Sequence, residues 1–280
     1  MQDWISYWQL LPYHISPNIL TIGAFQLRYY SLMYLVAFFL TYILVAYRLR
    51  KEDFKFSLET IQDFFLWGIF GLIIGARLGY VFFYNPGYYL HHPLEIIIPL
   101  DFSHGVRFVG ISGMSYHGGA LGIIIAALIF CHNRKIDFWN LADLFCPTFP
   151  LGYTFGRVGN FINGELFGRV TNVPWGMFFP FAPSRELRHP SQLYEAFFEG
   201  IVLFVVLWVI RKWRPFAGFH LALYIIGYGL IRFFIEYYRE PDAHLGFIWS
   251  ILSMGQLLCV AMIITGLGII VMRKTVEKQV

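Results

Sequence analysis

The sequence is poor in charged residues and in cysteine. Charged residues make up 14% of its 280 positions, whereas hydrophobic residues make up 58%. Ordinary soluble domains carry about 25% charged residues, and a soluble chain of this length could not bury so much apolar surface in one core. The three cysteines, Cys131, Cys146 and Cys259, are scattered and form no CxxC pattern. We therefore expect a membrane protein with no disulfide framework, no metal site and no cofactor.

The start of the sequence is also poor in basic residues. Its first twenty residues contain no lysine or arginine, so they do not form the basic n-region of a signal peptide. We expect the first spanning helix to drive membrane insertion, with nothing cleaved.

What the sequence does contain is a series of long apolar runs. A helix of about 20 residues, rising ~1.5 Å per residue, crosses the ~30 Å hydrocarbon layer. The fourth run contains Pro147, Pro150 and several glycines, which predict a kinked helix that packs closely against its neighbours. The seven runs that fit this length cover approximately residues 29–46, 61–84, 115–131, 141–161, 194–210, 219–238 and 252–272.

The positive charge is gathered at one side of these runs. All six lysines lie in the stretches 48–55, 134–135, 211–214 and 273–278, together with six of the arginines. Such basic stretches mark cytoplasmic loops and tails. The sequence therefore predicts one all-α polytopic membrane domain over 1–280, with about seven spanning helices, the N-terminus outside and the C-terminus in the cytoplasm. Outer loops are expected at about 85–112 and 163–189, and the charge of +4 does not imply a nucleic acid partner.

Several ionisable residues fall inside or near the outer ends of the apolar runs. Arginine at the centre of a spanning helix costs about 2.5–3.5 kcal/mol on insertion scales, so such residues are functional candidates. For Arg77 and for the pair Glu195 and Glu199, a structural ion pair and a functional role are both open. Arg157 and Arg232 favour function, because each is accompanied by other polar residues.

Arg157 stands in the polar segment GRVGNFINGE, residues 156–165. Arg157 and Asn160 are three residues apart and so share a helix face. With Asn163 and Glu165 they suit an anionic headgroup, because a guanidinium binds phosphate oxygens and amides bind neighbouring hydroxyls. A polar helix cap is the alternative interpretation.

Two further stretches carry candidate residues. Tyr228, Arg232 and Glu236 recur at intervals of four and line one face of the sixth run, where Arg232 could face Arg157 across the bundle. They could also be polar contacts between helices. His117, at the outer start of the third run, has the chemistry of a proton acceptor, although a lone histidine is more often structural.

Together these stretches resemble the prolipoprotein diacylglyceryl transferase family. The resemblance covers most of the chain, and its most specific part is the segment 156–169, which is similar to the family signature. The other matching stretches are RYYSLMY at 28–34, GARLGY at 75–80, GMSYHGGALG at 113–122, HPSQLYE at 189–195 and the residues from Gly227 to Asp242.

The resemblance implies a bacterial cytoplasmic (inner) membrane enzyme. Family members transfer the diacylglyceryl group of phosphatidylglycerol to the lipobox cysteine thiol of a secreted prolipoprotein, beside its signal peptide, and release glycerol phosphate. The expected partners are thus phosphatidylglycerol and the signal peptide of a prolipoprotein. This is the first step of lipoprotein maturation.

The chemistry that the resemblance implies needs a thiolate and a stabilised leaving phosphate. We expect His117 to accept the thiol proton, with Tyr30 as a positioning hydrogen-bond partner, since a thiol with a pKa of ~8.5 is mostly protonated at neutral pH. An arginine-centred mechanism with a structural His117 is also open. Arg157 and Arg232 would hold the phosphate. The remaining lipid contacts are expected from Asn160, Asn163, Glu165, Tyr228, Glu236, which would hold Arg232 in place, and Arg77.

Other classes compete with this interpretation. Buried arginines and a helix broken by glycine and proline would also suit a transporter or flippase for an anionic lipid or solute. No inverted repeat is visible, and a transporter gives no reason for His117. A membrane scaffold would leave the arginines unexplained. An intramembrane protease lacks a G-x-S-x-G motif or paired aspartates in the spans.

Overall fold

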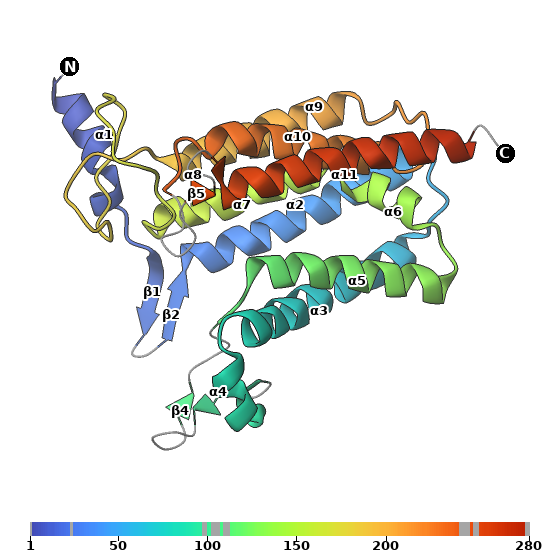
Figure 1. The fold of residues 1–280 in the computed structure, drawn as a ribbon, viewed down its shortest axis with the longest axis horizontal. Helices are drawn as coiled ribbons and strands as arrows, with labels where there is room; N and C mark the ends of the chain where they lie inside the picture. Colours follow the sequence, from blue (N-terminus) through green and yellow to red (C-terminus); the bar gives the residue numbers. More distant parts are fainter. Residues whose placement is uncertain are drawn as a thin grey trace. The chain divides into compact units, whose positions relative to one another are not determined.

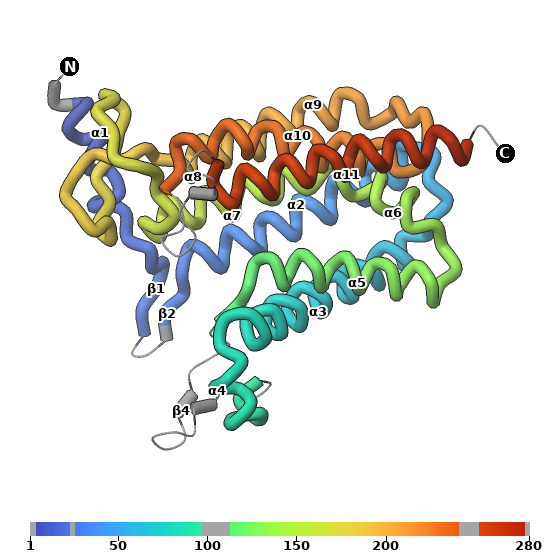
Figure 2. The backbone as a smooth tube through the Cα atoms, viewed as in Figure 1, coloured from blue at the N-terminus to red at the C-terminus, as the bar shows by residue number. Residues whose placement is uncertain are grey.

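The computed structural model is mainly helical and consists of two compact units (Figures 1 and 2). Unit 1 combines Met1–Asp53 with Trp139–Val280, and unit 2 is Phe54–Phe138. Each unit is described by itself. The described residues are 2–22, 25–96, 100–101, 107–108, 113–240, 247–248 and 252–277.

Unit 1 is a bundle built around α2, α7 and the helices that follow residue 190. Contacts between elements are most extensive between α10 and α11, between α2 and α7, and between α7 and η2. In Figure 1, α1 lies at one end of this bundle and the end of α11 at the other. The helices of unit 1 are α1 (Gln2–His14), α2 (Tyr29–Lys51), α6 (Phe138–Phe145), α7 (Phe149–Ile162), α8 (Ser191–Tyr194), η2 (Glu195–Val202), α9 (Leu203–Val209), α10 (Phe219–Ile235) and α11 (Met254–Glu277).

Short hairpins and an irregular loop complete unit 1. Strand β1 (Asn18–Ile22) pairs antiparallel with β2 (Phe25–Arg28), and β5 (Phe247–Ile248) pairs with β6 (Leu252–Ser253). The predicted outer loop 163–189 contains no helix and is tied by bridges from Gly168 to Arg239 and from Val170 and Met177 to Arg188. Its apolar side chains Met177 and Phe179 pack with Phe161 of α7.

Among the described residues, five helices are long and apolar enough to cross a membrane, with mean hydropathies from 1.3 to 2.2. They are Tyr29–Lys51, Leu58–Phe83, Tyr116–Arg134, Ser191–Val209 and Met254–Glu277, and a shorter apolar helix spans Phe219–Ile235. The expectation of an all-helical, multi-pass membrane protein is therefore confirmed. The count of seven crossings and the outward orientation of the N-terminus stay predictions.

The fourth predicted span is two helices rather than one kinked helix. α6 ends at Phe145, a turn covers residues 146–148, and α7 begins at Phe149. Pro147 lies in the turn and Pro150 in the first turn of α7, where its missing N–H is not needed. The 14 residues of α7 rise roughly 21 Å, which is less than the hydrocarbon thickness.

The basic stretch at the end of α2 contains a fully buried arginine. Arg48 is 0% exposed, and it donates from Nε and Nη2 to the Glu52 carboxylate at 2.7–3.0 Å. Its Nη1 donates to the carbonyls of Asp143 and Leu144 at 2.7 and 2.6 Å, and Nη2 also donates to the carbonyl of Arg211 at 3.3 Å. This Arg48 clasp ties α2 to α6 and to the end of α9.

Unit 2 is a helix pair joined by a segment with short helices and strands. Its elements are α3 (Leu58–Phe83), α4 (Pro86–His91), the 3₁₀ helix η1 (Pro93–Ile96), β3 (Leu100–Asp101), β4 (Arg107–Phe108) and α5 (Tyr116–Arg134). Within the predicted loop 85–112, residues 97–99, 102–106 and 109–112 lie outside the described residues, as do Pro241, Asp242 and Lys278 elsewhere in the chain.

Glycines form the contact between α3 and α5. Gly71, Gly75 and Gly79 face Gly118 and Gly122, and a Cβ added to Gly79 would lie 2.7 Å from the Gly118 Cα. No larger residue fits, so the two backbones approach as closely as in the small-xxx-small contacts of membrane helices. We call this contact the glycine seam.

Candidate functional site

Two arginines from different helices meet at one buried carboxylate. The Nε of Arg157, on α7, lies 2.8 Å from Oε2 of Glu195, and Nη1 of Arg232, on α10, lies 3.0 Å from the same oxygen. Both arginine side chains are 13% exposed, whereas Glu195 is 0% exposed. The Glu195 carboxylate is thus buried more deeply than the two arginine side chains that contact it.

A third arginine and two further carboxylates extend this group. Nη1 of Arg239 lies 3.3 Å from Oε1 of Glu195, and Nη2 of Arg232 lies 3.0 Å from Oε2 of Glu236. The expected contact between Glu236 and Arg232 is therefore present. Nη1 of Arg232 is 3.7 Å from Oε1 of Glu199. We call Arg157, Arg232, Arg239, Glu195, Glu199 and Glu236 the arginine cluster.

The charges of the arginine cluster balance when every member is ionised, with three guanidinium groups against three carboxylates. Buried charges are kept only where they are paired in this way. No group of three or more His, Cys, Asp or Glu side chains within the described ranges is arranged to hold a metal ion.

The element η2 brings the two carboxylates to α7. It is a π-helix, a rare form with i to i+5 hydrogen bonds that often occurs at functional sites. A Cβ on Gly200 would overlap the Thr154 side chain, whose Oγ1 donates to the Ala196 carbonyl at 3.3 Å. This close approach of η2 to α7 places Glu195 and Glu199 beside Arg157.

Tyr153 is a member of the site that the sequence interpretation missed. Its hydroxyl accepts a hydrogen bond from Nε of Arg157 at 2.6 Å and donates to Oε2 of Glu199 at 2.5 Å. Its ring meets the Tyr228 ring edge to face at 5.7 Å, so predicted Tyr228 lies beside the cluster. A tyrosine in an apolar run gives no signal by itself, but the spacing of four residues to Arg157 puts both on one helix face.

The amides predicted to bind a headgroup lie at the end of α7. Nδ2 of Asn160 and Nδ2 of Asn163 donate to the same Glu165 oxygen, at 2.9 and 3.2 Å. Nη1 of Arg157 donates to Oδ1 of Asn160 at 3.4 Å. Oδ1 of Asn163 is buried and has no hydrogen-bond partner among the described atoms. These residues form a polar chain from Arg157 to the outer loop.

Tyr30 lies next to this chain in unit 1. Its hydroxyl is 2.9 Å from the hydroxyl of Tyr34, and its ring packs on Gly159, where an added Cβ would lie 2.9 Å from Cδ2 of Tyr30. Glycine is therefore required at position 159 for Tyr30 to approach α7. In the segment that precedes α8, His189 is partly buried, and burial lowers the pKa of its imidazole.

His117 and Arg77 belong to unit 2. His117 is the second residue of α5, exposed, with its ring 5.8 Å from that of Tyr116. Arg77 donates to the carbonyls of Glu95 at 2.5 Å, Ile96 at 3.0 Å and Gly113 at 3.4 Å. These contacts hold the segment around η1 against α3, which favours a structural role for Arg77.

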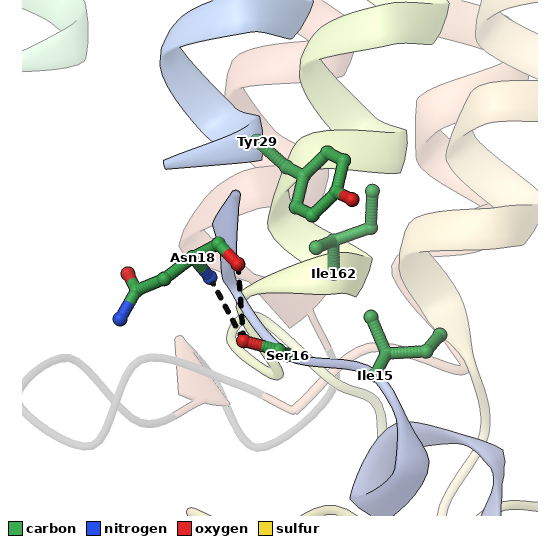
Figure 3. A pocket seen from close by; sticks show the side chains of 5 residues that line it. All are labelled: Ile15, Ser16, Asn18, Tyr29 and Ile162. Carbon is green, nitrogen blue, oxygen red and sulfur yellow. Dashed lines mark hydrogen bonds between the residues drawn. The ribbon is translucent and has the colours of Figure 1, made fainter. Parts of the chain in front are cut away.

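A pocket of about 330 Å³ lies where the chain enters α2, close to the end of α7 (Figure 3). Its walls are mostly apolar, and Ser16 is hydrogen-bonded to the backbone of Asn18. The lining residues are Ile15, Ser16, Asn18, Tyr29 and Ile162.

Known proteins resemble this chain over almost its whole length. The family model described as prolipoprotein diacylglyceryl transferase matches residues 17–272. A protein of Chlorobaculum tepidum is 51% identical over 275 residues, which is 98% of this chain and 95% of the relative. Proteins of Desulfotalea psychrophila and Campylobacter hominis are 45% and 42% identical, covering 94% of this chain and 94% and 92% of their own lengths. All three are named phosphatidylglycerol–prolipoprotein diacylglyceryl transferase.

Proposed function

This chain belongs to the prolipoprotein diacylglyceryl transferase family, and we propose that it moves the diacylglyceryl group of phosphatidylglycerol to a cysteine thiol of a prolipoprotein. The observation that carries the site is the meeting of Arg157 and Arg232 at Glu195. The cysteine is the one in the lipobox of the precursor's signal peptide. The enzyme lies in the bacterial inner membrane, with its N-terminus outside and its C-terminus in the cytoplasm.

The reaction is a substitution at a glyceryl carbon. The thiol sulfur forms a bond to that carbon, the carbon–oxygen bond to the phosphate breaks, and its electron pair leaves with glycerol phosphate. Arg157 and Arg232 bind the phosphate and balance the charge that develops on the departing oxygen. Low dielectric inside the bundle strengthens this stabilisation. Nη2 of Arg157 has no hydrogen bond within the described chain, so it is open to a phosphate oxygen.

The polar chain beyond Arg157 orients the glycerol headgroup. Asn160 and Asn163 both donate to Glu165, which fixes their amide planes. The unpaired Oδ1 of Asn163 accepts a glycerol hydroxyl, since a buried acceptor without a partner is unfavourable. This assignment gives each of these residues a contact with the part of the lipid that becomes the by-product.

We propose that His117 accepts the thiol proton. If this is correct, His117→Asn slows transfer by roughly 10²–10⁴-fold, the usual contribution of a general base. Raising the pH partly restores this variant, because solvent then supplies the thiolate. Initial rates against pH for wild type and His117→Asn measure the effect. An unchanged rate at every pH removes histidine from the mechanism and leaves an arginine-centred one.

One assay tests the function as a whole. Purified protein is incubated with phosphatidylglycerol and a lipobox peptide, and the peptide is examined by mass spectrometry. We expect the peptide to gain one diacylglyceryl mass and its Cys→Ser variant to gain none. Flux of an anionic lipid or solute without peptide modification would instead support the transporter interpretation, which the names of the relatives do not favour.

A further inference from the structure

The guanidinium of Arg157 makes its short polar contacts at one nitrogen, Nε. Its Nε faces both Oε2 of Glu195 at 2.8 Å and the Tyr153 hydroxyl at 2.6 Å. Its two Nη atoms make one long hydrogen bond, from Nη1 to Asn160 at 3.4 Å. The direction in which the Nη atoms point is therefore set by whatever fixes Nε.

The Tyr153 hydroxyl has a single proton and two carboxylates within reach. Oε2 of Glu199 is at 2.5 Å and Oε2 of Glu195 at 3.3 Å, so the proton is donated to Glu199. The oxygen of the hydroxyl is then directed to Nε of Arg157 as an acceptor. Two short hydrogen bonds thus form a chain: one joins Arg157 to Tyr153, and the other joins Tyr153 to Glu199.

Glu199 itself is 0% exposed, and its other oxygen has no hydrogen bond among the described atoms. The distance of 3.7 Å from this oxygen to Nη1 of Arg232 is that of a loose ion pair. Burying a carboxylate costs several kcal/mol, so a residue with such poor compensation needs a reason to be there. The 2.5 Å hydrogen bond from Tyr153 is its closest contact.

We propose that Tyr153 and Glu199 are positioning residues of the arginine cluster. Glu199 holds the Tyr153 hydroxyl, and the hydroxyl holds Nε of Arg157 so that both Nη atoms of the guanidinium face the phosphate of the lipid. The inference rests on the proposed function, because it assigns Arg157 to the phosphodiester. It adds that the orientation of Arg157 is maintained by two residues that do not touch the substrate.

The first test is Tyr153→Phe, which removes the hydroxyl and keeps the ring against Tyr228. A displacement of about 1 Å at a catalytic contact can cost 10²-fold in rate, so we expect kcat to fall roughly 10–100-fold, with a smaller change in KM for phosphatidylglycerol. Tyr47→Phe is the matched control, because Tyr47 is an exposed tyrosine of α2 whose ring stacks on Trp208. Its rate should equal that of wild type.

Two variants at position 199 test whether the hydrogen bond from Tyr153 matters or only the volume of the side chain. Glu199→Gln keeps an oxygen that accepts the Tyr153 hydroxyl proton, so it should retain most of the rate. Glu199→Met has a similar length without an acceptor, so it should behave like Tyr153→Phe. The double variant Tyr153→Phe with Glu199→Met should be no slower than either single one, since both break the same chain.

The outcomes separate this inference from the proposed function. A wild type that leaves the peptide unmodified overturns the function. An active wild type whose Tyr153→Phe variant, folded and extracted normally, has an unchanged kcat overturns the positioning role alone. Equal losses in Glu199→Gln and Glu199→Met also overturn it, because charge rather than the hydrogen bond then matters. A purely structural role would reduce the amount of folded protein and leave kcat per folded enzyme unchanged.

Discussion

Arg48 and Arg157 are both buried in unit 1 and both paired with glutamate, but they are satisfied to different degrees. Arg48 is fully buried, and all five of its N–H groups have acceptors in Glu52 and three backbone carbonyls. Arg157 is 13% exposed and has no hydrogen bond at Nη2 within the described residues. Arginine thus serves two purposes in this bundle. Arg48 uses all its donors to hold helices together, whereas Arg157 keeps a donor for a ligand.

The difference teaches how to tell a structural arginine from a functional one. Both carry the cost of removal from water, and both have a carboxylate to offset it. In the Arg48 clasp no donor is left for anything else. In the arginine cluster, Nη2 of Arg157 makes no hydrogen bond within the described residues, so a donor is left for a ligand. The number of free N–H groups distinguishes the two, whereas burial alone does not.

The largest effect is expected when the Arg48 clasp is broken. Arg48→Gln removes the donors of two backbone carbonyls of α6 and leaves Glu52 paired with Arg211 at 3.3 Å. Losing one partner of a buried pair costs about 3–5 kcal/mol. We expect the free energy of unfolding in detergent to fall by that amount, while the transfer rate per folded molecule stays near that of wild type. A stable variant with a reduced rate would contradict the comparison.

Substitution of Arg157 should lower the transfer rate more than the stability, which is the reverse of the effect expected at Arg48. Arg157→Gln should lower the transfer rate by about 10²–10³-fold, as loss of one stabilising donor does elsewhere, with a smaller change in unfolding. Arg157→Lys keeps the charge but loses the two-pronged guanidinium, so it should also stay far below wild type. Initial rates and thermal unfolding of the same preparations give both quantities. Near-normal turnover of the lysine variant would mean that a point charge suffices.

A smaller effect on the transfer rate is expected at Glu236, which pairs with Arg232. Glu236→Gln keeps the side-chain shape and an oxygen for the Ser253 hydroxyl, which donates to Glu236 at 3.1 Å. It removes the charge that faces Nη2 of Arg232 at 3.0 Å. We expect roughly a tenfold loss of rate, since a partly buried ion pair should be worth more than an exposed pair at about 0–1 kcal/mol and less than a fully buried one at about 3–5 kcal/mol. Glu236→Asp should not restore the rate, because its shorter side chain cannot span the distance.

The smallest effect is expected at an exposed pair in unit 2. Arg134 and Asp63 are paired, but their side chains are 55% and 34% exposed. Surface ion pairs contribute about 0–1 kcal/mol, so Arg134→Gln should change neither unfolding nor transfer by more than this. If the free energy of unfolding fell as much as in Arg48→Gln, stability would depend on the number of ion pairs. It would not depend on whether every N–H group of the arginine has an acceptor.

The class of fold could be predicted from the sequence because the bilayer imposes length and hydropathy on every spanning helix. The runs at 29–46, 61–84 and 252–272 became α2, α3 and α11. The break between α6 and α7 was harder to foresee, since proline kinks some spanning helices and ends others. Helix α1 and the first hairpin were missed, because a short aromatic segment with Pro12 and Pro17 has no clear period.

Local spacing identified half of the site. The three-residue step from Arg157 to Asn160 and the four-residue step from Arg232 to Glu236 both correspond to contacts. The pairing of both arginines with Glu195 depends on which helices pack together and on the π-helix of η2, and neither is encoded in a short stretch of sequence. Arg48 illustrates the same limit, because its carbonyl partners lie about a hundred residues away.

The shortness of α7 bears on how this chain enters the membrane during synthesis. A 14-residue helix that carries an arginine is a poor substrate for insertion by itself, since that residue costs about 2.5–3.5 kcal/mol and the segment does not span the bilayer. Its counter-charge, Glu195, is made some forty residues later, at the start of the next long apolar helix. We therefore expect α7 to remain at the translocon until η2 has been synthesised. The two helices would then enter the lipid together. The ion pair between Arg157 and Glu195 would then also assist the insertion of α7 into the membrane, before the mature site exists.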